Sequence, residues 1–506
     1  FSDGDRHVLC VNNEYVNLPV MFANRASKRP ESADDVLKAM AAHGVSVMQL
    51  GRSGKDWAVQ KDAPLNRRIT AATPMIIDGP AAGHTRLQTT ADPSGRRAFG
   101  TFNNCGAGRT PWGTYLTCEE NFNGYFSSSD ADVTIDAEQT RYGIKAKDRG
   151  YGFAGVDQRF DIAKNPNEPS RFGYVVEIDP FDPDKVPVKH SALGRIKHEN
   201  AEVVVNGTGH VVVYMGDDER GEFLYRYVSN GTWREGAGGG DLLANGTLYA
   251  AKFNDDLSGE WLPLIPQTTG MPAAEICFLT RIAASRAGAT TMDRPEWVAA
   301  HPGKPEIYCA LTNNKNRGVK PNAGGDATPV GGPNPRAENL YGQIVRWRPD
   351  GGDHTARRFM WDLFAMAGNP VVHGDANAGS KNINAANMFN SPDGLVFDRR
   401  GRLWIQTDGS QPDGSNNQML LADPDSGEIK RFLVGPVDCE VTGVTSTPDG
   451  TTVFVNIQHP GDSGGAENPT ETTDLRHHIR RGNHHIEFRP ALLDLGDEVV
   501  QSNVVR

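Results

Sequence analysis

The sequence predicts an all-β protein, a β-propeller of six blades with long loop insertions and a few short helices. One pattern recurs at 203–215, 395–406 and 441–457: an acidic residue, an apolar strand, a turn with glycine, a second apolar strand and a polar cluster. The 56 glycines and 32 prolines among 506 residues are typical of many short strands joined by turns. Helical periodicity is almost absent, and radial repetition of short strands is the closed architecture that fits best.

The predicted elements follow in order along the chain. Residues 8–16 form the first strand, and 32–43 form the clearest helix, with Ser32 as N-cap and an apolar stripe that stops at Gly44. Residues 45–50 and 57–60 alternate like an edge hairpin. Residues 98–104 and 113–117 are expected to pair as the next two strands, and further strands are expected at 223–228, 342–348 and 418–422.

We expect a single domain that spans residues 1–506. Residues 127–169 and 313–335 carry few apolar side chains, so they are interpreted as insertions between strands rather than linkers between domains. The segment 461–506 is predicted to be a peripheral tail that ends in a closing strand.

Composition excludes several classes of function. The formal charge is 52 minus 63, or −11, which disfavours a nucleic-acid-binding surface. The chain contains no apolar run of about 18 residues, so no membrane span is expected. No signal peptide is visible in the chain as printed. The six cysteines form no CxxC pair, which excludes a zinc ribbon, and a bridge between Cys105 and Cys118 is conceivable.

The stretch from Thr110 to Phe126, TPWGTYLTCEENFNGYF, is the centre of the functional hypothesis. A short strand at 113–116 is expected to deliver Cys118, Glu119 and Glu120 to its end. Adjacent carboxylates repel, and a thiol beside them is acidified only by a cation, so a bound metal ion explains the cluster. The alternative is a strand end that runs into a solvated acidic turn.

Acidic residues also stand at the ends of the other predicted inner strands, whose ends would point toward one axis. The candidate ligands are the acids Glu199, Glu202, Asp217, Asp218, Glu338, Asp393, Asp408 and Glu440, together with the amide of Asn200. Carboxylates suit calcium, magnesium or manganese, whereas a thiolate beside carboxylates suits iron or zinc. The adjacent Asp217 and Asp218 fit a ligand pair and an ordinary turn equally well.

An anionic substrate would need arginines as fork-shaped donors. Arg336, two residues before Glu338, is the first candidate, and Arg67 and Arg68 come second; an ordinary surface arginine explains Arg336 equally well. The chain contains no P-loop and no HExxH helix.

Several segments resemble the PhoX family of bacterial alkaline phosphatases. They are NRRITAATPM, GPAAGH, FNNCGAGRTPWGTYLTCEENFNGYF, KHENAEV, YMGDDERGEFLYRYV and SPDGLVFDRRGRLWIQTDG, and the resemblance runs from about residue 8 to about residue 460. It implies a β-propeller, periplasmic or secreted, that hydrolyses phosphomonoesters with a cluster of Fe³⁺ and Ca²⁺ ions. A small-molecule phosphomonoester would be the substrate, and we expect a monomer.

The resemblance also implies roles for individual residues. Cys118 would be the cysteine ligand of iron, and Arg336 and Glu338 would be the phosphate-binding arginine and metal-binding glutamate of an RxE pair. The catalytic set is therefore expected to be Arg336, Cys118 and Glu338. The other metal ligands would be Glu119, Glu120, Glu199, Glu202, Asp393 and Glu440.

Two rival functions use the same acids. A calcium-dependent propeller lactonase or phosphotriesterase would contain calcium without iron, and a non-catalytic propeller would use the acids as structural calcium sites. The residues alone lead only to a metal-dependent propeller of open activity, and the long block around Cys118 favours the phosphatase.

Overall fold

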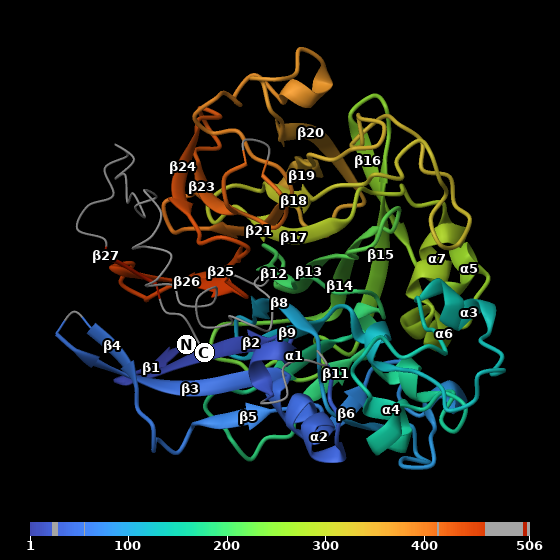
Figure 1. Cartoon of the computed structure of the whole chain (residues 1–506). Coiled ribbons are helices and arrows are strands. Elements are labelled where there is room, and N and C mark those ends of the chain that lie inside the picture. Colours follow the sequence, from blue (N-terminus) through green and yellow to red (C-terminus); the bar gives the residue numbers. More distant parts are fainter. Residues whose placement is uncertain (23–28, 55, 412–413, 461–498, 503–506) are drawn as a thin grey trace. The chain divides into compact units, whose positions relative to one another are not determined.

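β-Strands, nearly all paired antiparallel, are the main regular secondary structure of the described residues (Figure 1). The computed structural model describes residues 1–22, 29–54, 56–411, 414–460 and 499–502. The chain divides into two compact units, each described by itself. The first unit comprises residues 1–218, 223–252 and 261–289, and the second comprises 219–222, 253–260 and 290–506.

Three groups of paired strands form the first unit. Strands β1 to β5 form one sheet in which β2 pairs with β3, and β7-β6-β11-β10-β9-β8 form another, in which β6 and β11 are parallel. Strands β12 to β15 form an antiparallel meander. The strands are β1 (Ser2–Asp3), β2 (Arg6–Asn13), β3 (Gly44–Ser53), β4 (Asp56–Val59), β5 (Arg67–Ile69), β6 (Pro74–Asp78), β7 (Arg97–Phe99), β8 (Asn104–Arg109), β9 (Tyr115–Glu119), β10 (Val175–Ile178), β11 (Val188–His190), β12 (Glu202–Val205), β13 (His210–Gly216), β14 (Leu224–Thr232) and β15 (Gly246–Phe253).

Short helices lie between these strands. Helix α2 has the predicted N-cap Ser32, which forms a capping box with Asp35, and it buries Val36, Ala39 and Met40. The helices are α1 (Leu18–Met21), α2 (Ala33–Ala42), α3 (Ala137–Arg141), α4 (Phe153–Val156), α5 (Pro266–Thr269), α6 (Ala273–Phe278) and α7 (Thr280–Ala287), with 3₁₀ turns η1 (Thr85–Leu87), η2 (Phe122–Tyr125), η3 (Gln158–Phe160), η4 (Glu168–Arg171) and η5 (Ser191–Leu193).

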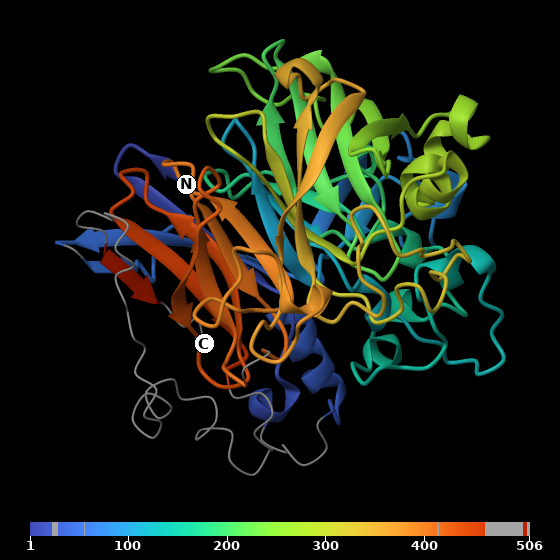
Figure 2. The same ribbon diagram turned by 90° about the horizontal axis from the view of Figure 1, so that it is seen from above.

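The second unit contains two four-stranded antiparallel meanders, β17 to β20 and β21 to β24, of which the second is drawn in orange in Figure 2. Residues 258–260 of β16 pair with β20, and β25 pairs with β26. The elements are β16 (Ser258–Pro263), β17 (Pro295–Ala300), β18 (Ile307–Leu311), β19 (Gln343–Pro349), η6 (Asp350–Gly352), β20 (Arg358–Met366), η7 (Ala376–Ala378), β21 (Pro392–Phe397), β22 (Leu403–Thr407), β23 (Gln418–Ala422), β24 (Ile429–Val434), β25 (Glu440–Ser446), β26 (Thr452–Gln458) and β27 (Val499–Ser502).

The three predicted repeats are present as the antiparallel hairpins β12–β13, β21–β22 and β25–β26. The predicted pairing of 98–104 with 113–117 is wrong, because β7 pairs with β6 and β8 pairs with β9. Strand β9 also reaches Glu119, so Cys118 and Glu119 belong to the strand instead of following it. Both residues are therefore held in a sheet, not in a turn.

The predicted insertions lie between strands. Residues 127–169 fall between β9 and β10 and contain short helices, whereas 313–335, all described, contain neither helix nor strand. Most of the predicted tail lies outside the described residues. Within it, β27 pairs with β26 in parallel. The single-domain organisation stays a prediction.

An aromatic cluster around Phe102 forms the centre of the first unit's core. Its ring centroid lies 4.5 Å from that of Phe172 and 4.7 Å from that of Tyr125. Phe122, Tyr125 and Phe126 are all buried. Because these three residues directly follow Glu120 and Asn121, packing of the core fixes the chain immediately after β9.

None of the helices in the described part of the chain is long and apolar enough to cross a membrane.

Candidate metal centre

Three buried acids converge in the first unit. Glu120 follows β9, Glu199 precedes β12 and Asp218 follows β13. One oxygen atom of each carboxylate lies within 4.8 Å of those of the other two, and all three residues are buried. Three charges so close together in a buried place need a compensating positive charge, so this acid trio is the strongest candidate cation site in the first unit.

Backbone hydrogen bonds explain why these acids meet. The segment 197–199 lies between the ends of two strands: the His198 amide donates to the Glu119 carbonyl at 3.1 Å, and the Asp218 amide donates to the Lys197 carbonyl at 3.1 Å. The antiparallel register of β12 with β13 pairs Glu202 with Tyr214. Acids placed before the first strand and after the second therefore reach the same end of this hairpin.

A glycine permits the close approach of β8 to this segment. A Cβ atom on Gly106 would lie 2.0 Å from the Glu199 carbonyl oxygen, so no larger residue fits there. The register between β8 and β9 shifts between Asn104 and Ala107, which leaves Cys105 and Gly106 at an irregularity in the ladder. The Cys105 thiol donates to Glu199 Oε2 at 3.2 Å. Cys105 is thus a site residue that sequence reasoning did not nominate.

Cys118 is fully buried in β9. Burial raises the pKa of its thiol, and the negative charges of Glu199 and Glu119 raise it further. The thiol is therefore protonated at neutral pH unless a cation lies beside it. No disulfide joins any of the six cysteines, all of which are described, so the conceivable bridge between Cys105 and Cys118 is absent.

Glu119 has a different set of contacts from Glu120. Its carboxylate accepts hydrogen bonds from Lys189 Nζ at 2.6 Å and from the Gly173 and Tyr174 amides at 2.9 and 3.1 Å. Both Glu119 and Lys189 are fully buried, and burial lowers the pKa of Lys189 while Glu119 opposes that shift. These contacts account for Glu119 as half of a buried ion pair, and they do not support its prediction as a metal ligand.

The adjacent acids Asp217 and Asp218 separate in the same way. Asp217 accepts hydrogen bonds from Arg281 Nε at 2.8 Å and Nη2 at 2.5 Å, and from the Lys197 amide at 3.1 Å. Asp218 belongs to the acid trio. Asp217 is therefore a structural acid, and Asp218 is a candidate metal ligand.

The second unit has its own pair of acids. Glu296 in β17 and Asp393 in β21 are both buried, and one carboxylate oxygen of each lies within 4.8 Å of the other. Glu296 is missing from the sequence-based candidates. Its signal was the spacing of Arg294 and Glu296, a second R-x-E motif in RPEWV.

Arg294 lies directly beside this pair of acids. Its Nη2 is 3.2 Å from Glu296 Oε1, and its side chain is 24% exposed. The backbone of Arg294 has φ +53°, a conformation that costs free energy in a residue with a side chain and is often found at functional sites. The preceding Asp293 is held by Arg317 Nε at 2.6 Å and by Asn339 Nδ2 at 3.0 Å. The insertion 313–335 thus fixes the segment that carries Arg294.

Arg336 and Glu338 do not form the predicted pair. The Arg336 side chain is buried, and its guanidinium donates to the carbonyls of Ala367 at 2.7 Å and of Gly342. Burial lowers its pKa to about 10. Glu338 is exposed and has φ +42°. Because the fork of Arg336 is occupied by backbone carbonyls, this geometry argues against its predicted role in phosphate binding.

The other predicted residues lie as follows. Glu202 is half-buried at the start of β12, and Glu440 is buried at the start of β25 with its Oε2 4.0 Å from His459 Nε2. The guanidinium of Arg67 donates to the Leu65 carbonyl, and that of Arg68 donates to the Ala42 and His43 carbonyls after α2. Both arginines thus have structural partners.

The donors fit a metal centre. The acid trio supplies buried carboxylate oxygens that suit a hard cation such as calcium, and the thiols of Cys105 and Cys118 add ligands that suit iron. The Cys105 thiol contacts Glu199 directly, whereas Cys118 is buried in β9, the strand that Glu120 follows. The residues present therefore fit both kinds of ion that the resemblance implies.

Comparison with known proteins decides the family. The family model described as alkaline phosphatase PhoX matches residues 1–461. The chain belongs to the PhoX family of alkaline phosphatases. Pseudomonas fluorescens PhoX, solved in complex with vanadate, a transition state analogue, is 49% identical, with 92% of this chain and 83% of that chain covered and a TM-score of 0.87. No curated protein matches the chain.

A gluconolactonase from Xanthomonas campestris gives only 10% identity and a TM-score of 0.27, over 77% of this chain and 85% of that chain. A likeness this weak carries no argument for a lactonase. Membership of the PhoX family makes the protein a phosphatase that hydrolyses phosphomonoesters.

Proposed function

We propose that this PhoX phosphatase releases inorganic phosphate by in-line displacement at a centre that contains Fe³⁺ and Ca²⁺. The observation that carries the proposal is the burial and convergence of Glu120, Glu199 and Asp218. When bound, such cations neutralise the charge of the phosphate and the charge that develops on the attacking and leaving oxygens. This local positive charge offsets the net charge of −11 on the protein.

Each residue has a stated part in this proposal. The acid trio holds a cation in the first unit, and Cys118 and Cys105 supply thiol ligands beside Glu199. In the second unit, Glu296 and Asp393 form a second pair of ligands. Glu119 acts as a positioning residue, because its ion pair with Lys189 fixes the end of β9 that presents Glu120. The parts of Glu202, Glu338 and Glu440 stay predictions.

We infer that Arg294, not Arg336, is the arginine that binds phosphate. Arg294 is partly exposed beside Glu296, whereas Arg336 is buried and donates to backbone carbonyls. A planar guanidinium can donate two parallel hydrogen bonds to phosphate oxygens, and lysine cannot reproduce that geometry.

Replacing Arg294 should therefore change KM, whereas replacing Arg336 should change the free energy of unfolding. We expect Arg294→Met to raise KM for p-nitrophenyl phosphate about 10- to 100-fold, since a charged hydrogen-bond donor is lost. Arg336→Met should instead lower the free energy of unfolding by about 2–4 kcal/mol, because carbonyls that it satisfies lose their donors. Steady-state kinetics and urea denaturation separate the two effects. An increase in KM for Arg336→Met, with unchanged stability, would return the phosphate-binding role to Arg336.

Metal analysis of a cysteine variant tests the mixed centre. We expect Cys118→Ser to lose most of its iron, measured as iron per protein by mass spectrometry, and to lose phosphatase activity with it. Cys309→Ser is the matched control, because Cys309 is also fully buried but lies in β18 of the second unit. Full iron content and activity in Cys118→Ser would remove this cysteine from the metal centre.

We also propose a fold, an oligomeric state and a location for the protein. We propose that the meanders β12–β15, β17–β20 and β21–β24 are blades of a six-bladed propeller, since four-stranded antiparallel sheets are the unit of that fold. We also propose a monomer that acts on small-molecule phosphomonoesters in the periplasm or outside the cell, and that has no nucleic-acid-binding surface. The family resemblance supports the location, and the negative net charge supports the last point.

A further inference from the structure

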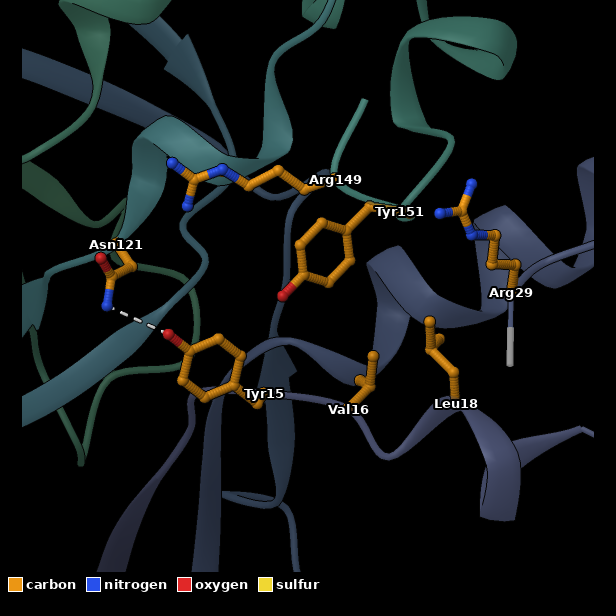
Figure 3. Close-up of a pocket in the computed structure, with 9 residues that line it drawn as sticks. Tyr15, Val16, Leu18, Arg29, Asn121, Arg149 and Tyr151 are labelled. Atoms are coloured by element: carbon orange, nitrogen blue, oxygen red, sulfur yellow. Dashed lines mark hydrogen bonds between the residues drawn. The ribbon is translucent and has the colours of Figure 1, made fainter. Parts of the chain in front are cut away.

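The first unit contains a cavity of about 350 Å³, and none of the proposed metal ligands is among the residues that line it. Its lining includes the side chains of Tyr15, Arg29, Asn121, Arg149 and Tyr151 (Figure 3). Two arginines thus line a pocket on a protein with a net charge of −11. Its lining therefore favours an anionic ligand.

The pocket is connected to the acid trio by hydrogen bonds. Asn121 Nδ2 donates to Tyr15 Oη at 3.0 Å and also to Glu120 Oε2, so one side chain contacts both places. Figure 3 shows the Arg149 side chain reaching toward Asn121, with the Tyr151 hydroxyl pointing into the same space. Asn121 therefore joins the pocket to one acid of the trio.

Local structure holds Arg149 and Tyr151 in place. The Asp148 carboxylate accepts hydrogen bonds from the Gly150 and Tyr151 amides at 2.9 and 3.2 Å, which fixes the loop that carries both residues. The Tyr151 ring stacks on Tyr125 with a centroid distance of 4.2 Å. A Cβ atom on Gly124 would contact Arg149 Cδ at 3.5 Å, so the arginine side chain lies across this glycine.

Electrostatics support the same connection. Burial is the largest cause that raises the pKa of Tyr151, and the charges of Glu14 and Glu120 raise it further. A hydrogen bond with Tyr125 and the charge of Arg149 lower this pKa. The charges of Arg149 and Glu120 therefore both act on this one hydroxyl. Glu14 acts in the same direction as Glu120, because both acids raise the pKa of Tyr15 and of Tyr151.

We propose that this pocket is a subsite for a second phosphate group, carried by the leaving part of the substrate, with Arg149 as its principal donor. A guanidinium beside tyrosine hydroxyls can donate several hydrogen bonds to phosphate oxygens. The volume is large enough for a phosphate together with part of a sugar. The subsite rests on the proposed phosphatase reaction beside Glu120, and it makes bisphosphorylated compounds preferred substrates.

Glucose 6-phosphate and glucose 1,6-bisphosphate form a matched pair of probes, because they differ by one phosphate. We expect the metal-loaded enzyme to have a higher kcat/KM for the bisphosphate, mainly through a lower KM. Arg149→Met should reduce the ratio of the two kcat/KM values about 10- to 100-fold, as expected for the loss of one charge-assisted hydrogen-bond donor. Arg234→Met, which changes an exposed loop arginine outside the pocket, should keep the ratio of the unchanged enzyme.

The outcomes distinguish the subsite from the reaction itself. An equal kcat/KM for the two substrates in the unchanged enzyme, or an unchanged ratio in Arg149→Met, overturns the subsite. An equal loss on both substrates also overturns it, because Arg149 would then act on the reacting phosphate. A metal-loaded enzyme that hydrolyses neither compound contradicts the proposed reaction. Melting temperatures of both variants verify that they are folded.

Discussion

Replacing Glu199 by Gln should lower kcat/KM for p-nitrophenyl phosphate by about 10³-fold or more, since a bound cation supplies several kcal/mol of transition-state stabilisation. The amide keeps the shape of the side chain but removes one of three charges that converge within 4.8 Å. The metal content per protein should fall in parallel.

The same variant should change stability in opposite directions with and without metal. In chelated protein, Glu199→Gln removes repulsion within the acid trio, so its melting temperature should rise. In metal-loaded protein it weakens the cation that stabilises the folded state, so its melting temperature should fall. Glu235→Gln, at an exposed position, should change neither temperature nor kcat/KM. A variant that melts lower than the original protein under both conditions would indicate a purely structural role for Glu199.

Replacing Lys189 by Met should give the second large effect, a loss of about 3–5 kcal/mol in the free energy of unfolding. Lys189 is fully buried, and its Nζ lies 2.6 Å from Glu119 Oε1 and 3.8 Å from the centroid of the Phe172 ring. The substitution leaves the buried carboxylate of Glu119 without its cation. Urea denaturation measures the loss.

Two further variants isolate the ion pair. The double variant Lys189→Met with Glu119→Gln should recover part of the stability, because no charge is then left uncompensated. Lys185→Met is the surface control, since its partner Asp179 is 3.4 Å away and the lysine side chain is 49% exposed. That pair should contribute less than about 1 kcal/mol. Equal losses for Lys185→Met and Lys189→Met would contradict the role given to the buried pair.

Local patterns were sufficient for much of the fold. Ser32 and the apolar stripe behind it predict α2, and the three recurring hairpins are where their alternation places them. The ion pair of Glu119 was not predictable, because its partner Lys189 lies 70 residues further along the chain. Glu119 and Glu120 are equivalent in the sequence and differ only through such distant partners.

The site was predictable only in part for the same reason. Strand-end acids led to Glu120, Glu199 and Asp218, whose convergence follows from one hairpin and the strand beside it. Its spacing from Glu338 favours Arg336 as the phosphate-binding residue, but the guanidinium of Arg336 donates its hydrogen bonds to the carbonyls of residues 342 and 367. Arg294 and Glu296 have the same R-x-E spacing as Arg336 and Glu338. What distinguishes Arg294 and Glu296 is that the carboxylate of Glu296, in β17, lies close to that of Asp393.

Anomalous diffraction from crystals of the active, metal-loaded protein can locate the cation proposed for the acid trio. Data collected on both sides of the iron absorption edge, and at long wavelength for calcium, locate each ion. We predict an anomalous peak at coordination distance from carboxylate oxygens of Glu120, Glu199 and Asp218. Active crystals whose peaks all lie elsewhere, with these three carboxylates bound to no metal, would contradict the account.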